Sequence, residues 1–377
     1  MRNKKGAFAG FIIGLLMVPG SIALHAWNEY RTIHRTHGLQ EAQRDVVSIE
    51  PEQRSTDQDG KLVHLSGESR TEAILTDEEF AISQNAVHLR RTVEMYQWTE
   101  DKEERDDHTT YNYQLEWKEG RVDSDSFNRR SGHENPIPKF ASRSSSAKRV
   151  DVGLFHLNNE LRDQMQNWQP VDFGETSITE TRPNDSERFT TYENVFYWSE
   201  SSPRPDSPQI GDLKISFDKV TPGDVSFVAK LAGETFETYR TSNGEPIERL
   251  YDGILGVEEV FANLKSENTI LAWMLRGLGA LLCVIGVLLI FGPVQKMFSW
   301  IPYVGDFTGG LFFLAALLIG GAISLTTISI SWIAVRPLMG IGLLVAAGLS
   351  FFLLSKLGKN SKAETQRITV TDDMLIE

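Results

Sequence analysis

Four long apolar runs frame this chain and predict membrane-spanning helices. They occupy residues 6–27, 271–291, 307–333 and 338–354. A helix needs about 20 apolar residues to cross the hydrocarbon core of a bilayer. The third run is longer than this and would tilt, while the fourth is short. The pattern therefore predicts four transmembrane helices, one N-terminal and three C-terminal.

The first apolar run also has features of a signal peptide. Arg2, Lys4 and Lys5 precede it, and the small residues near Pro19 could form a cleavage site. Its length is closer to that of a full membrane span, which favours an uncleaved anchor over residues 1–27. Cleavage remains the alternative at this stage.

Between the first two apolar runs the hydrophobic pattern changes to a period of two, which indicates strands. Residues 86–98, AVHLRRTVEMYQW, give the longest example. Further strands are expected at 61–69, 110–117, 150–157, 188–198, 211–217, 225–233 and 236–241. A helical stalk over residues 28–49, with helix as far as Gly38, should lead into them. We therefore predict an α+β membrane protein with a large, β-rich antiparallel domain over residues 50–269.

The strand at 86–98 has one apolar and one polar face. Inward positions are Val87, Leu89, Val93 and Met95. His88, Arg90 and Glu94 point outward and form either a solvated sheet face or the polar centre of an active site. We favour the solvated face, which is ordinary for antiparallel sheets. Arg91 falls on the apolar face, so it should pair with a carboxylate or mark a bulge or sheet edge.

Charge is concentrated in the part of the chain between the apolar runs. Residues 28–269 hold 28 basic and 46 acidic side chains, a formal charge of −18. Such a surface repels nucleic acid and anionic lipid headgroups, so we expect no nucleic-acid binding by this domain.

Basic residues in both tails predict the membrane orientation. Three bases precede the first run, and Lys356, Lys359, Lys362 and Arg367 follow the last. Cytoplasmic flanks are enriched in Lys and Arg, so both ends should be cytoplasmic. Residues 28–269 then lie in a bacterial periplasm or, in a eukaryote, in the lumen of the endoplasmic reticulum and the perinuclear space. Residues 270–355 form a three-helix region with an aromatic interfacial loop at 292–306, followed by a cytoplasmic tail at 356–377.

Reactive side chains give little sign of catalysis. The chain lacks the G-x-S-x-G, phosphate-loop, H-E-x-x-H and strand-linked G-x-G-x-x-G patterns. Cys283 is the single cysteine, and His34 and His37 lack a third ligand fixed by sequence, so neither a metal nor a cofactor is expected. His133 beside Glu134 could transfer protons, but its Gly-x-x-Asn-Pro setting is typical of a turn.

Two side-chain patterns in the apolar runs predict helix packing. Gly6, Gly10 and Gly14 lie along one side of the first span and could bring two copies together or receive another span of the same chain. Ser324, Thr327 and Ser331 form a hydroxyl stripe on the third span, which more often bonds between helices than lines a pore.

Arg276 is the charged residue within the spans, and it falls in the first turns of the second run. At mid-membrane it would cost about 2.5–3.5 kcal/mol on the insertion scale. We therefore expect it at the outer edge of the membrane, with its charged end directed toward water.

Several segments resemble the transmembrane protein 43 (LUMA) family. They are LVHLSGESRT, HLRRTVEMYQW, YNYQLEW, SDSFNRRSGHENP, IGDLKISF, WMLRGLG, SWIPYVGD and VRPLMG, in order along the chain. The resemblance implies four spans and one large luminal or periplasmic domain. Eukaryotic members reside in the endoplasmic reticulum and inner nuclear membrane, self-associate, and bind lamins and emerin; bacterial members also occur. The compact organisation of the chain suggests a bacterial member, and its short N-terminal tail argues against transferring those partner contacts.

From these features we expect a non-enzymatic membrane scaffold. It should form homo-oligomers in the bilayer and organise a membrane patch or other membrane proteins through its acidic domain. A channel or transporter component using the hydroxyl stripe is the first alternative. A membrane-bound hydrolase using His133 or His88 is the second. The resemblance supplies no catalytic residue set.

Overall fold

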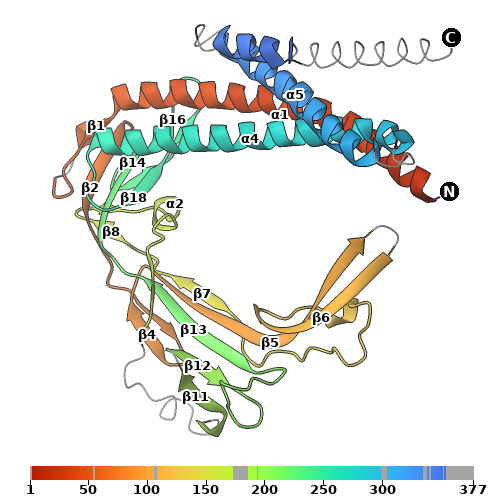
Figure 1. The fold of residues 1–377 in the computed structure, drawn as a ribbon. Helices are drawn as coiled ribbons and strands as arrows, with labels where there is room; N and C mark the ends of the chain where they lie inside the picture. The colour runs from red at the N-terminus through yellow and green to blue at the C-terminus, as the bar shows by residue number, and fades with distance from the viewer. Residues whose placement is uncertain are drawn as a thin grey trace, which may run out of the picture. The chain divides into compact units, whose positions relative to one another are not determined.

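The fold is described from a computed structural model of the full chain (Figure 1). The residues it describes are 2–53, 56–105, 108–172, 186–192, 194–298, 304–333, 338, 341–350 and 352–353. They divide into a helical unit, comprising residues 1–44, 240–245 and 261–377, and a β unit, comprising residues 45–239 and 246–260.

Helices and strands follow one another with few long interruptions. The helices are α1 (Arg2–Asp45), η1 (Thr56–Gln58), η2 (Ser124–Ser126), α2 (Asn159–Arg162), η3 (Ser186–Arg188), α4 (Val257–Phe298) and α5 (Val304–Ile333). The strands up to the middle of the chain are β1 (Val47–Ser48), β2 (Leu62–Arg70), β3 (Ile74–Asp77), β4 (Ile82–Asn85), β5 (His88–Arg105), β6 (His108–Glu119), β7 (Arg143–Ser146), β8 (Asp151–Val152), β9 (Phe155–His156) and β10 (Trp168–Pro170). The later strands are β11 (Phe189–Tyr192), β12 (Val195–Trp198), β13 (Leu213–Val220), β14 (Asp224–Ala232), β15 (Thr235–Glu237), β16 (Tyr239–Arg240), β17 (Pro246–Ile247) and β18 (Arg249–Asp252).

Two larger sheets build the β unit. The first has the order β15-β14-β2-β8-β9, with β1 added to β2 and β18 to β14. The second has the order β11-β12-β13-β5-β6, with β10 added to β13 and β7 to β5. Among the described pairings of these two sheets, β1 with β2 is parallel and the others are antiparallel. The antiparallel, β-rich domain expected from the sequence is confirmed.

Each sheet has its own hydrophobic core. Phe227, Val63 and Leu65 belong to a cluster on the first sheet, and Phe80 lies at the centre of an aromatic cluster on the second. The ring of Phe80 meets four other phenylalanine rings at centroid distances between 5.2 and 6.1 Å. Burial of large aromatic side chains supplies much of the stabilisation of such a core.

The inward positions along β5 are those that the period-two pattern predicts. Val87, directly before β5, and Leu89, Val93 and Met95 within it are each at most 3% exposed. Two other predicted strands are instead tight hairpins. Residues 188–198 divide into β11 and β12 around Asn194, whose φ of 60° lies in the left-handed region that Asn tolerates.

The second hairpin, β8–β9, turns at Gly153. A Cβ atom there would come within 2.2 Å of the carbonyl oxygen of Pro51, and the φ of Gly153 is 59°. Only glycine fits such a position without displacing the neighbouring backbone.

A two-stranded hairpin extends β5 beyond the second sheet. β13 and β7 pair with β5 no further than Met95, whereas β6 pairs with it as far as Arg105 (Figure 1). The segment 99–119, to which this hairpin belongs, is called the acidic arm below. Eight of these residues are acidic and three are basic.

The helical unit contains three helices that are long and apolar enough to cross a membrane. The apolar segments lie within Phe8–Asp45, Val257–Gln295 and Gly309–Ile333, and a shorter apolar helix covers Ile341–Ser350. The protein is therefore an integral membrane protein of the α+β class.

α1 continues to Asp45, seven residues beyond the end expected at Gly38. Gly38 faces the loop at 241–245, and a Cβ atom there would lie 2.6 Å from Cβ of Glu245. Gly38 thus permits a close approach within the helix instead of ending it, which corrects the expectation from sequence.

Candidate functional site

α1 and α4 lie side by side and antiparallel over most of their length (Figure 1). Close backbone approach at small residues makes this possible. A Cβ atom on Gly14 would lie 2.5 Å from the carbonyl oxygen of Gly286, and one on Gly279 would lie 2.7 Å from the ring of His25. Nearer the polar end of the helices, Asn28 Nδ2 donates to the carbonyl oxygen of Ala272 at 3.1 Å.

A buried ion pair joins the two helices. Arg276 Nε donates to Glu29 Oε1 at 2.6 Å, and Arg276 Nη2 donates to Glu29 Oε2 at 2.8 Å. Glu29 is fully buried and Arg276 is 6% exposed. This bidentate geometry is the strongest form of the arginine–carboxylate interaction. It also allows two charges to be withdrawn from water together.

α5 contributes to the same site through Trp332. Its indole Nε1–H donates to Glu29 Oε2. The guanidinium carbon of Arg276 lies 4.7 Å from the ring of Trp332 and 4.8 Å from that of Trp273. Cation–π contacts at these distances add stabilisation when the cation is desolvated. Glu29, Arg276 and Trp332 therefore connect all three long helices.

Several buried polar atoms near the ion pair have no partner within the described chain. They are both ring nitrogens of His25, Oδ1 of Asn28, Oδ1 of Asn268 and Oγ of Ser324. Buried polar atoms are usually hydrogen-bonded, so such a concentration is notable. It distinguishes this part of the helical unit from an ordinary apolar helix contact.

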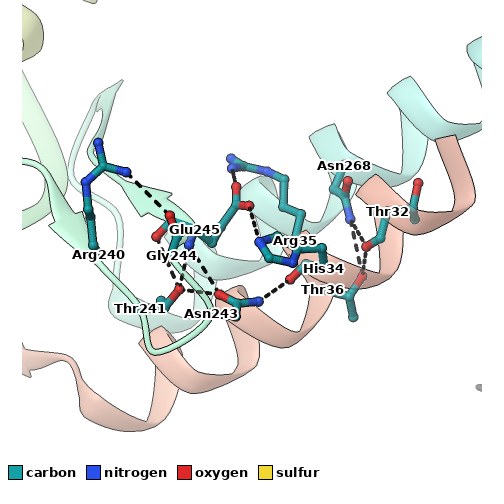
Figure 2. Close-up of polar contacts among 10 residues, drawn as sticks. All are labelled: Thr32, His34, Arg35, Thr36, Arg240, Thr241, Asn243, Gly244, Glu245 and Asn268. Carbon is teal, nitrogen blue, oxygen red and sulfur yellow. Dashed lines mark hydrogen bonds and ion pairs between the residues drawn. The ribbon is translucent and has the colours of Figure 1, made fainter. Parts of the chain in front are cut away.

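A loop at residues 241–245 contacts α1 next to this region (Figure 2). Glu245 pairs with Arg35, and its Oε2 lies 3.9 Å from Nε2 of His34. Asn243 Nδ2 donates to the carbonyl oxygen of His34 at 2.8 Å. One turn away, Asn268 Nδ2 donates to the carbonyl oxygen of Thr32 and to Oγ1 of Thr36, both at 3.2 Å.

His34 therefore contacts this loop. Among the described residues, no cluster of three metal-ligating side chains occurs.

The glycine stripe expected on the first span lies partly against α4. Gly14 is crowded by Gly286 and Ile290, and a Cβ atom on Gly10 would make an ordinary contact of 3.5 Å with Leu289. The surroundings of Gly6 lie outside what the structure describes. Of the two uses weighed from the sequence, contact with another span of the same chain is what Gly14 shows. Association between copies through this stripe stays a prediction.

The hydroxyl stripe on α5 makes contacts within its own helix. Thr327 Oγ1 donates to the carbonyl oxygen of Ile323 at 2.9 Å, and Ser331 Oγ donates to that of Thr327 at 3.1 Å. Ser324 is 3% exposed, and its Oγ is among the unpartnered atoms. A role of Thr327 and Ser331 between helices stays a prediction.

The polar face of β5 is only partly solvated. His88 is 6% exposed; its Nε2–H donates to the carbonyl oxygen of Arg162 at 3.0 Å, and Ser146 Oγ lies 2.8 Å from its Nδ1. Its expected outward position in solvent is therefore corrected. Arg90 is partly exposed, pairs with Asp218 at 3.0 Å and lies 4.3 Å above the ring of Trp168.

Glu94 is half-buried, opposite Lys214 on β13. With His88 and Arg90 it forms sheet contacts, and the three do not converge on one point.

Arg91 is buried and paired, as one of the interpretations from the sequence required. Its Nη1 lies 2.9 Å from Asp77 Oδ1 and 2.8 Å from Glu79 Oε2. Its Nε donates to the carbonyl oxygen of Ala141 at 3.0 Å. The guanidinium carbon is 5.0 Å from the ring of Phe80, so Arg91 connects β5 with residues 77–80 and with the segment at Ala141.

His133 and Glu134 support the base of the acidic arm. The ring of His133 stacks on Tyr113 at 4.0 Å and meets Trp98 edge-on at 4.7 Å. Glu134 Oε2 accepts from the backbone N–H of Gly132 at 3.0 Å. These contacts agree with the turn interpretation of this segment and leave proton transfer without structural support.

Burial changes two acid–base groups in the β unit. Withdrawal from water, followed by the hydrogen bond to Asp212, raises the pKa of Tyr197 far above its ordinary value. Burial lowers the pKa of His64, although a hydrogen bond to the carbonyl oxygen of Leu255 acts in the opposite direction. Both groups are therefore neutral at physiological pH and act as hydrogen-bonding groups of the core.

Comparison with known proteins identifies the family. The model of the family described as transmembrane protein 43 matches residues 95–337, which is more than half of the chain. The chain belongs to the transmembrane protein 43 family. The matched segment includes the acidic arm, Arg276 and Trp332.

Relatives in this family extend over nearly the whole chain. The transmembrane protein 43 homolog of Drosophila melanogaster is 32% identical, covering 88% of this chain and 90% of that protein. Transmembrane protein 43 of Homo sapiens is 29% identical, covering 90% and 87%. No solved structure matches. These animal relatives do not support the bacterial origin expected from the compact organisation of the chain.

Sequence reasoning found Arg276 but missed its partner. Glu29 lies two residues beyond the predicted end of the first span, so the hydrophobic pattern assigns it to the polar stalk. An arginine just inside one span and a glutamate just outside another are the available signal. Both lie near the same membrane surface if the two helices run antiparallel, and a charge at that depth is expected to have a partner.

Proposed function

We propose that this transmembrane protein 43 family member is a non-enzymatic, multi-pass scaffold that self-assembles and holds partner proteins through its acidic β unit. The acidic arm is the observation that carries this proposal. In this proposal the chain crosses the membrane four times, both termini lie in the cytoplasm, and the β unit lies on the opposite side. The animal relatives favour the lumen of the endoplasmic reticulum and the perinuclear space for the β unit.

The acidic arm has the properties of a binding element. Asp101, Lys102, Glu103 and Glu104 are all exposed, and the arm lies outside both hydrophobic clusters of the β unit. A net negative, projecting hairpin attracts a basic protein surface and orients it during encounter.

Contacts at its base give the arm a defined direction. Glu100 Oε2 accepts from the hydroxyl of Tyr113 and from the backbone N–H of Asn128, both at 2.6 Å. Asn135 Oδ1 accepts from the backbone N–H of Trp98 at 2.8 Å. A hairpin of two strands is only marginally stable in water by itself, so these contacts help to keep the arm extended.

The helical unit supplies a rigid membrane anchor for such a scaffold. Glu29, Arg276 and Trp332 connect α1, α4 and α5 at one level. Transport and hydrolysis receive less support. Thr327 and Ser331 use their hydroxyls within α5, and His88 and His133 are held in sheet and turn contacts.

Topology is tested by placing single cysteines in a Cys283→Ala background. Ser201→Cys lies at an exposed position of the β unit, and Ser361→Cys lies in the C-terminal tail. In sealed membrane vesicles, a membrane-impermeant maleimide should label the two positions from opposite sides. Labelling of both from one side would contradict the four-span orientation. The Cys283→Ala protein alone serves as the unlabelled control.

The role of the arm is tested by removing its charge. Asp101→Asn, Glu103→Gln and Glu104→Gln are combined in full-length protein; the control combines Glu50→Gln, Glu52→Gln and Glu68→Gln at exposed positions of the β unit. If each arm charge contributes about 0.5 kcal/mol, partner retention at low salt should fall about tenfold in the arm variant only.

Retention is measured by co-purification from crosslinked membranes at low and high salt, together with particle mass in mild detergent. Wild-type particles should contain several copies of the chain. A single-chain particle without a salt-sensitive partner would refute the scaffold, and equal loss in the control variant would remove the arm from it.

A further inference from the structure

Two cavities of different chemistry meet at the ion pair of the helical unit. The first has a volume of about 440 Å³ and lies between residues 29–40 of α1 and residues 265–276 of α4. The second has a volume of about 580 Å³ and is lined by α4, α5 and residues 342–343. Trp273, Arg276 and Trp332 line both. Both volumes are in the range of small-molecule binding sites.

The first cavity is polar and carries a net positive charge. Its walls include Thr32, Thr36, Gln40, Lys265, Asn268 and Thr269. Glu29 and Arg276 neutralise each other, so Lys265 leaves the lining with a formal charge of +1. Nε and Nη2 of Arg276 bind Glu29, and Nη1 takes no part in that pair. The cavity therefore suits an anionic polar group of some size.

The second cavity is mainly apolar, and small residues in its walls leave it open. Its walls include Gly277, Ala280, Gly321, Leu325, Ile328 and Gly342. A Cβ atom on any of the three glycines would meet nothing within 4 Å, whereas one on Gly14, Gly279, Gly286 or Gly320 would meet another helix. The bundle thus has glycines used for helix contact and glycines that open this cavity.

Aromatic side chains place the junction of the two cavities at a membrane surface. Trp27, Tyr30 and Trp273 are 55%, 68% and 62% exposed. Trp and Tyr are enriched at the level of lipid headgroups. The polar cavity extends from this level along the polar part of α1, and the apolar cavity extends along the membrane-spanning parts of α4 and α5.

Each cavity also contains a buried polar side chain with an unpartnered atom. Asn268 is 5% exposed, lines the polar cavity and has an unpartnered Oδ1. Ser324 is 3% exposed, lines the apolar cavity and has an unpartnered Oγ. A buried polar atom that lacks a partner is costly, and such groups in native proteins commonly mark functional sites.

We propose that these cavities form a binding site for one anionic phospholipid. The phosphate headgroup occupies the polar cavity beside Lys265 and Arg276, and one acyl chain lies over Gly277 and Gly321 in the apolar cavity. A sterol would use only a single hydroxyl and would leave most of the polar cavity and its charge unmatched. The proposal concerns the helical unit and does not depend on the scaffold function.

Quenching of tryptophan fluorescence by brominated acyl chains tests this site, since Trp273 and Trp332 line both cavities. Full-length protein is delipidated in detergent and titrated with brominated phosphatidylglycerol or brominated phosphatidylcholine. We expect saturable quenching with phosphatidylglycerol at concentrations about fivefold lower, because one lysine near a lipid surface contributes roughly this preference. Native mass spectrometry should show one phosphatidylglycerol retained per chain.

Variants separate the acyl and headgroup contacts. Gly277→Leu and, independently, Gly321→Leu fill the apolar cavity from different helices and should abolish saturable quenching. Gly292→Leu and Gly310→Leu are matched controls, since these glycines also have open space but lie outside the cavity lining. Lys265→Gln should remove the fivefold preference for phosphatidylglycerol and leave binding of phosphatidylcholine unchanged.

Each contrary outcome overturns a defined part of the proposal. Equal quenching in the cavity-filling and control variants would refute the acyl site. Equal affinity of the wild-type protein for the two lipids would refute the anionic headgroup. Displacement by cholesterol but not by unlabelled phosphatidylglycerol would show that the occupant is a sterol. Thermal unfolding of each variant confirms that the compared proteins are folded.

Discussion

Replacing Glu29 with Gln should lower the free energy of unfolding by about 3–5 kcal/mol, because the charge of Arg276 would stay buried without its partner. The substitution keeps the size of the side chain, so loss of packing contributes little. Glu29 is fully buried and accepts hydrogen bonds from both Arg276 and Trp332. Unfolding in mild detergent, followed by tryptophan fluorescence during titration with denaturant, measures the change.

A second variant separates charge from packing at this site. Combining Glu29→Gln with Arg276→Met removes both charges and should recover most of the lost stability, since a buried ion pair can be replaced by apolar groups at little cost. Glu68→Gln, in the exposed pair with Arg70, is the control and should change stability by less than about 1 kcal/mol. A double variant as unstable as Glu29→Gln alone would show that the pair is not the source of the effect.

Replacing Arg91 with Met should destabilise the β unit by about 3–5 kcal/mol. Asp77 would keep a buried carboxylate without its cation, and the carbonyl oxygen of Ala141 would lose a donor. Arg90→Met on the neighbouring position should cost no more than about 1 kcal/mol, since Arg90 and Asp218 are both partly exposed. Arg90→Met is thus the control for Arg91→Met.

Chemical unfolding of both variants, followed by circular dichroism in the far ultraviolet, gives the comparison. Similar losses at Arg90 and Arg91 would mean that the outward face of β5 is an organised polar site after all. A loss at Arg91 that Asp77→Asn largely reverses would confirm the ion pair as its cause.

Local patterns in the sequence determined the kinds of elements and their inner faces. Runs of apolar residues marked the membrane helices, because a bilayer requires a minimum length of continuous apolar chain. Alternation along residues 87–95 identified which side chains of β5 are buried, because successive side chains of a strand point to opposite faces. It also singled out Arg91 as an exception, and the family resemblance was visible in the same segments.

Tertiary structure alone decided which polar groups meet. Glu29 and Arg276 are far apart in sequence, and no local period connects them; the antiparallel packing of α1 and α4 does. His88 is buried because Trp168 and the carbonyl oxygen of Arg162, from a distant segment, cover a face that alternation marks as polar.

For Gly38 and the glycines of the membrane helices, too, the tertiary structure decided what the sequence pattern left open. Helix propensity marks Gly38 as a place to end α1, yet contact with the loop at 241–245 makes the missing side chain an advantage. Likewise, a glycine in a membrane helix can serve helix packing or open a cavity, and sequence spacing is the same for both. The neighbouring helix distinguishes Gly14 from Gly277, because burial of a position depends on what packs against it and not on its own period.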